Sequence, residues 1–256
     1  MATGKKDIEK IIRESKFPAP VKSAHERMEK AGSSQEGGLY RQIILGGQDG
    51  LVNVLGIILG VASATSQTKI VLVAGLAATF AESISMAAVA YTSARAAQDY
   101  YKSQLEQEKL EMRVVPDVER KEIELIYYKK GFRGKQLQEI TDHIVSDNKL
   151  WLDTMMKEEL GLYESEFTDP VREAGVVGAS SFFGSIIPLL PFFLLPVFPA
   201  VVSSVILSIM VLGIGGAVKA KLTTGKWYAS AIEMMVIGGI AAVSGWIIGS
   251  ALGAVL

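Results

Sequence analysis

Two groups of acidic and methionine side chains have the residue types and spacings that bind divalent metals. The first group lies in the charged middle of the chain: Glu108, Glu111, Glu119, Glu122, Met155, Met156 and Glu159. Residues three or four apart share one face of a helix. Paired glutamates on neighbouring helices resemble the carboxylate metal sites of helical bundles, and methionine adds a softer ligand. On spacing alone, a solvated face with ion pairs to Lys109, Arg120 and Lys121 is favoured over a metal site.

The second group lies within long apolar runs. Between Ile43 and Ala94 the acidic and basic side chains are Asp49, Lys69 and Glu82. A carboxylate at membrane depth is costly and usually marks an ion pathway or a proton relay. A helical rise of 1.5 Å per residue places Asp49 ~9 Å and Met86 ~13 Å from the same membrane face. Glu82 lies one turn further out than Met86, on the same helix face.

Two carboxylates with a thioether suit a borderline cation such as Fe²⁺, whereas carboxylates alone suit Mg²⁺ or Ca²⁺. Met86 taken alone is better explained as packing, because Met commonly fills gaps between apolar helices. Asp49 and Glu82 favour a functional role, because exposure of either to lipid is expensive. Glu233, near the start of the last apolar run, is a candidate for a pore entrance, and it could equally extend to water at the membrane surface.

Five apolar runs must position these groups. They are Ile43–Ala64, Ile70–Ala94, Gly175–Leu195, Val197–Val218 and Ala229–Val255. Each is long enough to cross a hydrocarbon layer of ~30 Å, and backbone groups in lipid must bond internally, so each run is predicted to be a helix. A soluble chain of 256 residues would have to hide five long, nearly uncharged helices. The predicted fold class is therefore all-α, a polytopic membrane protein with five transmembrane helices and a helical metal-binding insert.

The distribution of Lys and Arg predicts the orientation of these spans. Basic residues are frequent before the first span, in the insert and in the link between the last two spans, and they are absent from the link between spans three and four and from the C-terminus. By the positive-inside rule, the N-terminus and the insert face the cytosol, and the C-terminus faces away. The first 36 residues lack the hydrophobic stretch of a signal peptide. The absence of cysteine excludes disulfides and thiolate metal sites.

Turn and cap residues predict the helices of the insert. The helix of the second span is expected to continue past Arg95 to about Met112. Three further helices are expected: from Pro116 to about Lys130 with a stop at Gly131, over Lys135–Val145, and over Lys149–Leu160 with a cap at Gly161. The predicted organisation is a polar N-terminal segment (1–38), spans one and two (39–97), the insert (98–170) and spans three to five (171–256).

Small residues and prolines indicate how the spans pack. Glycines four apart let helix backbones approach closely, either within one subunit or between two. They are Gly56 and Gly60 in span one, and Gly245, Gly249 and Gly253 in span five. Pro188, Pro191 and Pro196 are expected to break or kink the outer end of span three.

From about Leu39 to Leu256, the chain resembles the vacuolar iron transporter family. Asp49-Gly50-Leu51 and Ile84-Ser85-Met86 are similar to the signatures of the first two spans. The glutamate pairs around Pro116-Asp117, the segment 151–162 and two prolines of span three also match, and the segment 151–162 is the most specific. Plant members carry a glutamate where this chain has Ala78, so Glu82 is expected to substitute for it.

This resemblance implies a homodimer of five-span subunits, with an ion path where the subunits meet. It implies exchange of Fe²⁺ for protons, with iron carried away from the cytosol. Asp49 and Met86 are then expected to line the path, and the seven glutamates and methionines of the insert are expected to form a cytosolic metal site. With the resemblance, the metal site is favoured over the solvated face.

Several functional classes stay open or are excluded at this point. Alternatives are a manganese or broad divalent-metal exporter, and a membrane-anchored iron sensor or store. Mn²⁺, Zn²⁺ and Co²⁺ are further candidates for the insert site. An enzyme is not expected, because the sequence shows no nucleophile–base set, phosphate loop or redox motif; neither an organic cofactor nor a nucleic-acid partner is expected. The expected location is a vacuolar membrane, or the plasma membrane in a prokaryote.

Overall fold

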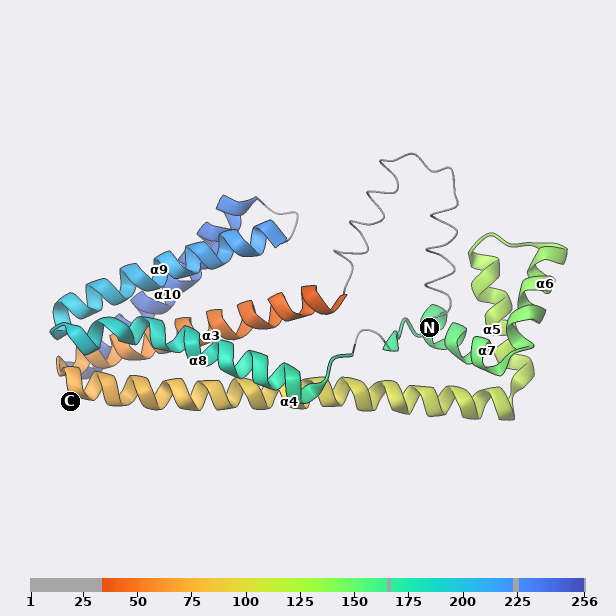
Figure 1. Cartoon of the computed structure of the whole chain (residues 1–256), viewed down its shortest axis with the longest axis horizontal. Helices are drawn as coiled ribbons and strands as arrows, with labels where there is room; N and C mark the ends of the chain where they lie inside the picture. The colour runs from red at the N-terminus through yellow and green to blue at the C-terminus, as the bar shows by residue number, and fades with distance from the viewer. Residues whose placement is uncertain (1–33, 165–166, 223–225, 256) are drawn as a thin grey trace, which may run out of the picture. The chain divides into compact units, whose positions relative to one another are not determined.

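The computed structural model describes residues 34–164, 167–222 and 226–255, and these residues form helices with no strand among them. The expected N-terminal segment lies, up to residue 33, outside the described residues. All packing reported below lies within the compact unit Arg41–Leu256. The helices are α3 (Ser34–Thr65), α4 (Thr68–Val114), α5 (Pro116–Lys129), α6 (Gly134–Val145), α7 (Asn148–Thr154), the π-helix η1 (Met155–Glu159), α8 (Pro170–Leu194), α9 (Val197–Leu222) and α10 (Trp227–Gly253) (Figure 1).

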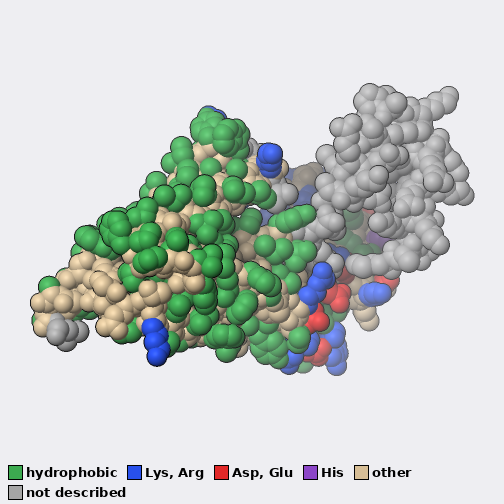
Figure 2. Space-filling view, turned by 60° about the vertical axis from the view of Figure 1, so that its left-hand side comes forward, with side chains coloured by type: hydrophobic (Ala, Val, Ile, Leu, Met, Phe, Trp, Pro, Cys, Tyr) green, Lys and Arg blue, Asp and Glu red, His purple; other side chains and the backbone are tan. Residues whose placement is uncertain are grey.

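Five of these helices, α3, α4, α8, α9 and α10, are long and apolar enough to cross a membrane. The five predicted spans and the all-α class are therefore confirmed. On the face drawn in Figure 2, apolar side chains cover the spanning helices, and acidic and basic side chains gather beyond them. This separation of apolar and charged surface is what a bilayer requires, because lipid cannot solvate charge.

α4 is a single helix of 47 residues. At 1.5 Å per residue it is ~70 Å long, more than twice the ~30 Å of a hydrocarbon layer. Its first half packs along α8, and its far end contacts α5, α7 and η1 (Figure 1). One helix therefore carries a spanning segment, up to about Ala94, and continues outside it as a stalk for the insert.

Most helices of the insert begin and end where the turn residues predict. Pro116 occupies the first turn of α5, where its missing N–H costs nothing. Gly131 and Gly161 have φ of +103° and +66°, a left-handed conformation that favours glycine at a helix end. The fourth predicted helix differs from the expectation: it is α-helical only to Thr154 and then becomes the π-helix η1.

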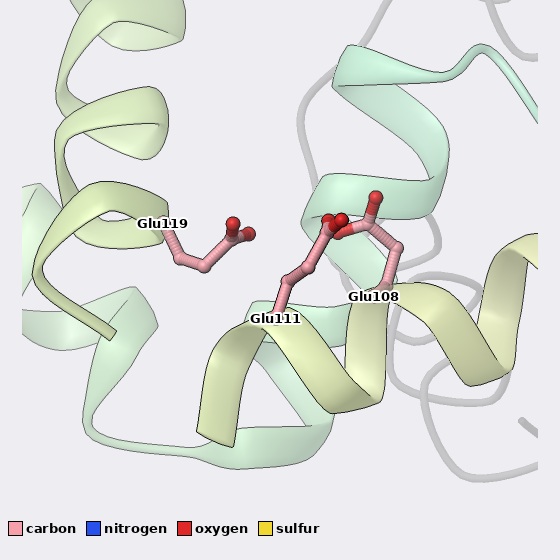
Figure 3. Close-up of side chains that lie close together, drawn as sticks. All are labelled: Glu108, Glu111 and Glu119. Carbon is pink, nitrogen blue, oxygen red and sulfur yellow. The ribbon is translucent and has the colours of Figure 1, made fainter. Parts of the chain in front are cut away.

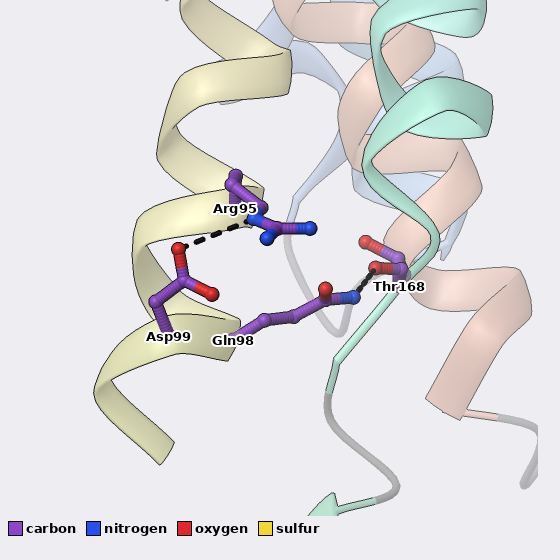
Figure 4. Close-up of polar contacts among 4 residues, drawn as sticks. All are labelled: Arg95, Gln98, Asp99 and Thr168. Carbon is purple, nitrogen blue, oxygen red and sulfur yellow. Dashed lines mark hydrogen bonds and ion pairs between the residues drawn. The ribbon is translucent and has the colours of Figure 1, made fainter. Parts of the chain in front are cut away.

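A second connection ties the insert to the stalk. The Gln98 side chain on α4 donates a hydrogen bond to the Thr168 carbonyl at 2.9 Å, immediately before α8 (Figure 4). Arg95 and Asp99 form an ion pair at 3.2 Å on the same stretch of α4. Tyr101 packs on Phe167 with ring centroids 5.0 Å apart. The chain that returns from the insert is thus held against α4 where the spanning part ends.

Glycines pack α3 against two neighbours of the same chain. A methyl group on Gly184 of α8 would collide with the Gly47 carbonyl of α3. On α10, methyl groups at Gly245 and Gly249 would collide with the carbonyls of Gly56 and Gly60, one turn apart on α3. The glycine ladders are therefore contacts between helices of one subunit, and they fix the position of α3 between α8 and α10.

α8 runs through two of its prolines without a break. Pro188 and Pro191 lie inside the helix, which ends at Leu194, with the extended residue Leu195 before Pro196. The neighbouring helix α9 contacts this stretch, where the Ser204 hydroxyl donates to the Pro188 carbonyl at 2.7 Å. Of the three expected interruptions, only the one at Pro196 ends the helix.

Candidate metal centres

Three glutamates of the insert converge where α4 meets α5. Carboxylate oxygens of Glu108, Glu111 and Glu119 lie within 4.8 Å of one another (Figure 3). Glu108 and Glu111 are one turn apart at the end of α4, and Glu119 is in the first turn of α5. The tight turn at Val115 brings these two helix ends together, so a spacing that sequence alone leaves ambiguous becomes one cluster.

Two of these carboxylates are buried without partners. Glu108 is 5% exposed and Glu119 is 3% exposed, and one carboxylate oxygen of each lacks a hydrogen-bond partner. Buried acidic groups are normally paired or bind a cation. The solvated-face interpretation does not describe them, because Lys109 pairs with Glu106 at 2.7 Å and Arg120 pairs with Asp142.

Burial and mutual repulsion raise the pKa values of carboxyl groups in this cluster. Desolvation, followed by the charges of Glu159, Glu111 and Glu122, raises the pKa of Glu108 to about 7. Desolvation, followed by the same group of carboxylates, raises the pKa of Glu119 to about 7. The pKa of Glu159 is also raised, first by desolvation and then by Glu122 and Glu111. The five predicted glutamates therefore lie within electrostatic reach of one another, and a bound cation would relieve their repulsion.

The predicted methionines lie in η1, which packs against both α4 and α5. Met155 and Met156 are 0% and 2% exposed, and Glu159 is the last residue of the π turn. Met155 also belongs to the apolar core of the insert, with Ile123, Ile144 and Trp151. π turns occur often at functional sites, and this one contains three of the seven predicted ligands.

Inside the spans, α3 and α4 bring polar side chains together. The Asn53 amide on α3 donates to Glu82 Oε1 on α4 at 3.1 Å. Asp49 is one turn before Asn53 on α3, and its carboxyl group lies near both the Glu82 and the Asn53 side chains. Two carboxyl groups and one amide therefore lie together inside the spans.

Three other positions singled out in the sequence lie outside this group. Met86 is on α4, one turn from Glu82, and is half-buried. The side chain of α4 that lies near Asp49 is Glu82. Ala78 packs against the buried apolar cluster that includes Val54. The carboxyl group of α4 near Asp49 therefore comes from Glu82, one turn after Ala78. Glu233 forms an ion pair with Lys219 at 3.8 Å, with side chains 60% and 40% exposed. Such an exposed pair contributes little stability.

Sequence reasoning missed Asn53. Its signal was an amide four residues after Asp49 within an otherwise apolar run, which places both side chains on one helix face. The π turn was also missed, because its residues have no composition that distinguishes them from an α-helix.

Comparison with known proteins gives a consistent picture. A model of the VIT family matches residues 40–250. "Vacuolar iron transporter 1" of Eucalyptus grandis is 34% identical over 206 residues, covering 80% of this chain and 83% of that protein. "Vacuolar iron transporter 2" of Oryza sativa is also 34% identical, covering 80% and 84%. "Protein CCC1" of Saccharomyces cerevisiae is 27% identical over 220 residues, covering 82% and 68%.

Proposed function

Because this chain belongs to the VIT family, we propose that it carries Fe²⁺ across a membrane, away from the cytosol and in exchange for protons. Plant relatives named vacuolar iron transporters support iron as the substrate. The observation in this chain that carries the proposal is the hydrogen bond from Asn53 to Glu82, which brings the Glu82 carboxyl group of α4 beside Asp49 within the spanning helices. A purely anchoring membrane segment has no use for such a pair, and this argues against a membrane-anchored sensor or store.

The direction of transport rests on the orientation of the spans. Lys and Arg are concentrated before α3, in the insert and around the link from α9 to α10, which the positive-inside rule assigns to the cytosol. The insert then collects Fe²⁺ on the cytosolic side. Movement through the spans carries it to the interior of a vacuole or, in a prokaryote, out of the cell.

The proposed transport cycle has three stages. The glutamates of the insert, with Met156 and Met155, bind Fe²⁺ and raise its concentration near the membrane. The ion passes to Asp49, Glu82 and Met86 in the spans, with Glu233 near the entrance. Protons from the far side then replace the metal on the two carboxyl groups, because each bound proton removes one negative charge and weakens the attraction for a cation.

Polar groups exposed on a single chain support the proposal that the protein is a homodimer. The hydrogen bond from Asn53 to Glu82 is exposed on the surface of the single chain, inside the segment that crosses the membrane. Polar groups facing acyl chains are expensive, so a protein surface is expected to cover them. A second copy places two such pairs on either side of one path, which explains why the polar groups lie at the surface of each subunit.

Manganese is a second candidate substrate, and one observation favours it. The two acidic groups that meet in the spans, Asp49 and Glu82, present carboxylate oxygens, which suit Mn²⁺ as well as Fe²⁺. Competition between the two ions for uptake into the same liposomes discriminates between them. Inhibition of Fe²⁺ uptake by an equal concentration of Mn²⁺ would indicate a broad divalent-metal exporter.

Purified protein in liposomes tests the proposal. Anaerobic Fe²⁺ uptake is measured with and without an imposed pH gradient. A gradient that is acidic on the release side is expected to accelerate transport, and Asp49→Ala is expected to abolish transport while metal binding by the insert persists. Uptake that ignores the gradient would rule out proton exchange, and full transport by Asp49→Ala would rule out this path.

A further inference from the structure

Asn53 lies between the two acidic side chains of the spans. It is on α3, ten residues into the first apolar run, which is ~15 Å of helix and thus near the middle of the hydrocarbon layer. An amide at this depth is costly unless its polar atoms have partners. Its retention there requires an explanation that packing does not provide.

Asn53 lies beside both carboxyl groups. The amide nitrogen donates to Glu82 Oε1 at 3.1 Å, and the side chain also lies near Asp49, one turn away on the same helix. A side-chain amide has two N–H donors, so one group can serve two acceptors. Asn53 and Asp49 are one turn apart on α3, whereas Glu82 comes from α4, so the amide links the two helices at the candidate path.

Nearby hydroxyl groups of α4 do not provide this link. The Thr79 hydroxyl donates to the Gly75 carbonyl at 2.9 Å, and the Ser83 hydroxyl donates to the Thr79 carbonyl at 2.6 Å. Both are buried and turned toward the backbone of their own helix. Among the described side chains, the neutral donor that reaches Glu82 is therefore Asn53.

We propose that Asn53 is a positioning residue of the intramembrane site, which holds Glu82 beside Asp49 so that both carboxyl groups meet one cation. The inference rests on the proposed function and extends it to a residue outside the predicted ligand set. An amide suits this role because it bridges two carboxyl groups and adds no charge that the incoming cation would have to overcome.

The substitutions that test the proposal keep size and change hydrogen bonding. Asn53→Leu is nearly isosteric and apolar, so lipid tolerates it, but it removes both donors. Asn53→Gln keeps the amide and should restore most of the function. Thr92→Val is a matched control, because it removes an exposed hydroxyl of α4 that bonds only the backbone of its own helix.

Two measurements on the full-length protein test whether Asn53 positions the site. In liposomes, Asn53→Leu is expected to raise the KM for Fe²⁺ about tenfold or more, the effect of losing one or two hydrogen bonds to charged groups, with little change in the maximal rate. In lipid nanodiscs, with the insert site removed by Glu108→Gln and Glu119→Gln, the same variant is expected to weaken anaerobic Fe²⁺ binding by a similar factor. Asn53→Gln and Thr92→Val should stay near the parent protein in both.

The possible failures are distinguishable. A protein that moves no Fe²⁺ in liposomes contradicts the proposed function, while the nanodisc titration still decides on Asn53. If Asn53→Leu binds Fe²⁺ as tightly as Thr92→Val does, Asn53 does not position the site. The same conclusion follows if the nanodisc protein binds no Fe²⁺ in its spans. Weakened binding that Asn53→Gln does not restore would identify a packing role instead.

Discussion

Carboxylate oxygens of Glu108, at the end of α4, and of Glu119, at the start of α5, lie within 4.8 Å of each other, although the two residues lie on different helices. Both side chains are buried, and each has a carboxylate oxygen without a partner. The turn at Val115 thus brings these buried carboxyl groups together. Such a cluster is unfavourable by itself, and this supports the proposal that it binds a cation.

Metal binding by the insert is expected to weaken in acid. Glu108 and Glu119 have pKa values of about 7, so each is largely protonated below that pH and must lose its proton to bind a cation. Between pH 8 and pH 6, the affinity is expected to fall by about tenfold for each of the two carboxyls. Calorimetry in buffers of different ionisation enthalpy measures both the affinity and the protons released. An affinity that does not change between pH 8 and pH 6 would show that the two carboxyl groups are not ligands.

Neutralising this cluster is expected to stabilise the metal-free protein. Because both pKa values are raised above the unfolded value near 4.5, the folded state loses stability as pH rises from about 4.5 through about 7. At pH 8, Glu108→Gln or Glu119→Gln is expected to increase the free energy of unfolding by roughly 1–3 kcal/mol while weakening metal binding. Thermal unfolding with and without Fe²⁺ measures both effects. Glu106→Gln, at an exposed position, is the control, and a drop in stability of the two buried variants would contradict the account.

Met156 is expected to influence which metal the insert prefers. Met156→Leu conserves volume, so the free energy of unfolding should change by less than about 1.5 kcal/mol. Loss of a thioether should weaken Fe²⁺ binding more than Mn²⁺ binding, because sulfur favours softer ions. Met112→Leu is the matched control, since Met112 packs against the core of the same insert but is not a predicted ligand. Equal behaviour of the two variants would assign Met156 to packing alone.

The close glycine contacts between α3 and α10 are expected to be required for full stability. A methyl group at Gly249 would collide with the Gly60 carbonyl, so Gly249→Ala should force the helices apart and cost about 1–3 kcal/mol. Gly239→Ala on the same helix meets nothing within 4 Å and should be neutral or slightly stabilising. Thermal unfolding in detergent compares them. If Gly249→Ala matches Gly239→Ala, the packing of α3 on α10 described above is wrong.

The absence of cysteine makes the orientation directly testable. Gln67→Cys, between α3 and α4, is expected to react with a membrane-impermeant thiol reagent from the side opposite the cytosol. His143→Cys, on α6 of the insert, is expected to react only from the cytosolic side. Labelling of sealed and opened vesicles distinguishes the two. The opposite pattern would reverse the proposed direction of transport.

Much of the fold could be predicted because its signals are local. Length and apolarity identify each span, and Pro116, Gly131 and Gly161 mark helix ends through backbone geometry that few other residues adopt. The glutamate pairs could be predicted as shared helix faces. Their convergence could be predicted only from the family resemblance, because it depends on the tight turn between α4 and α5.

The remaining features depend on contacts between distant segments. The sequence shows glycines four apart, but not that Gly56 meets Gly245 within one subunit. It shows Asp49 and Glu82 in two apolar runs, but not that Asn53 joins them. The π turn that begins at Met155 packs against α4 and α5 and has no local marker in the sequence.

Simultaneous measurement of Fe²⁺ and proton movement in sealed liposomes tests the central claim most directly. With wild-type protein, Fe²⁺ is expected to move in one direction and protons in the other, and Glu82→Gln is expected to slow both together. Iron that crosses without any counterflow of protons, or a Glu82→Gln variant that carries both ions at the wild-type rate, would contradict the account.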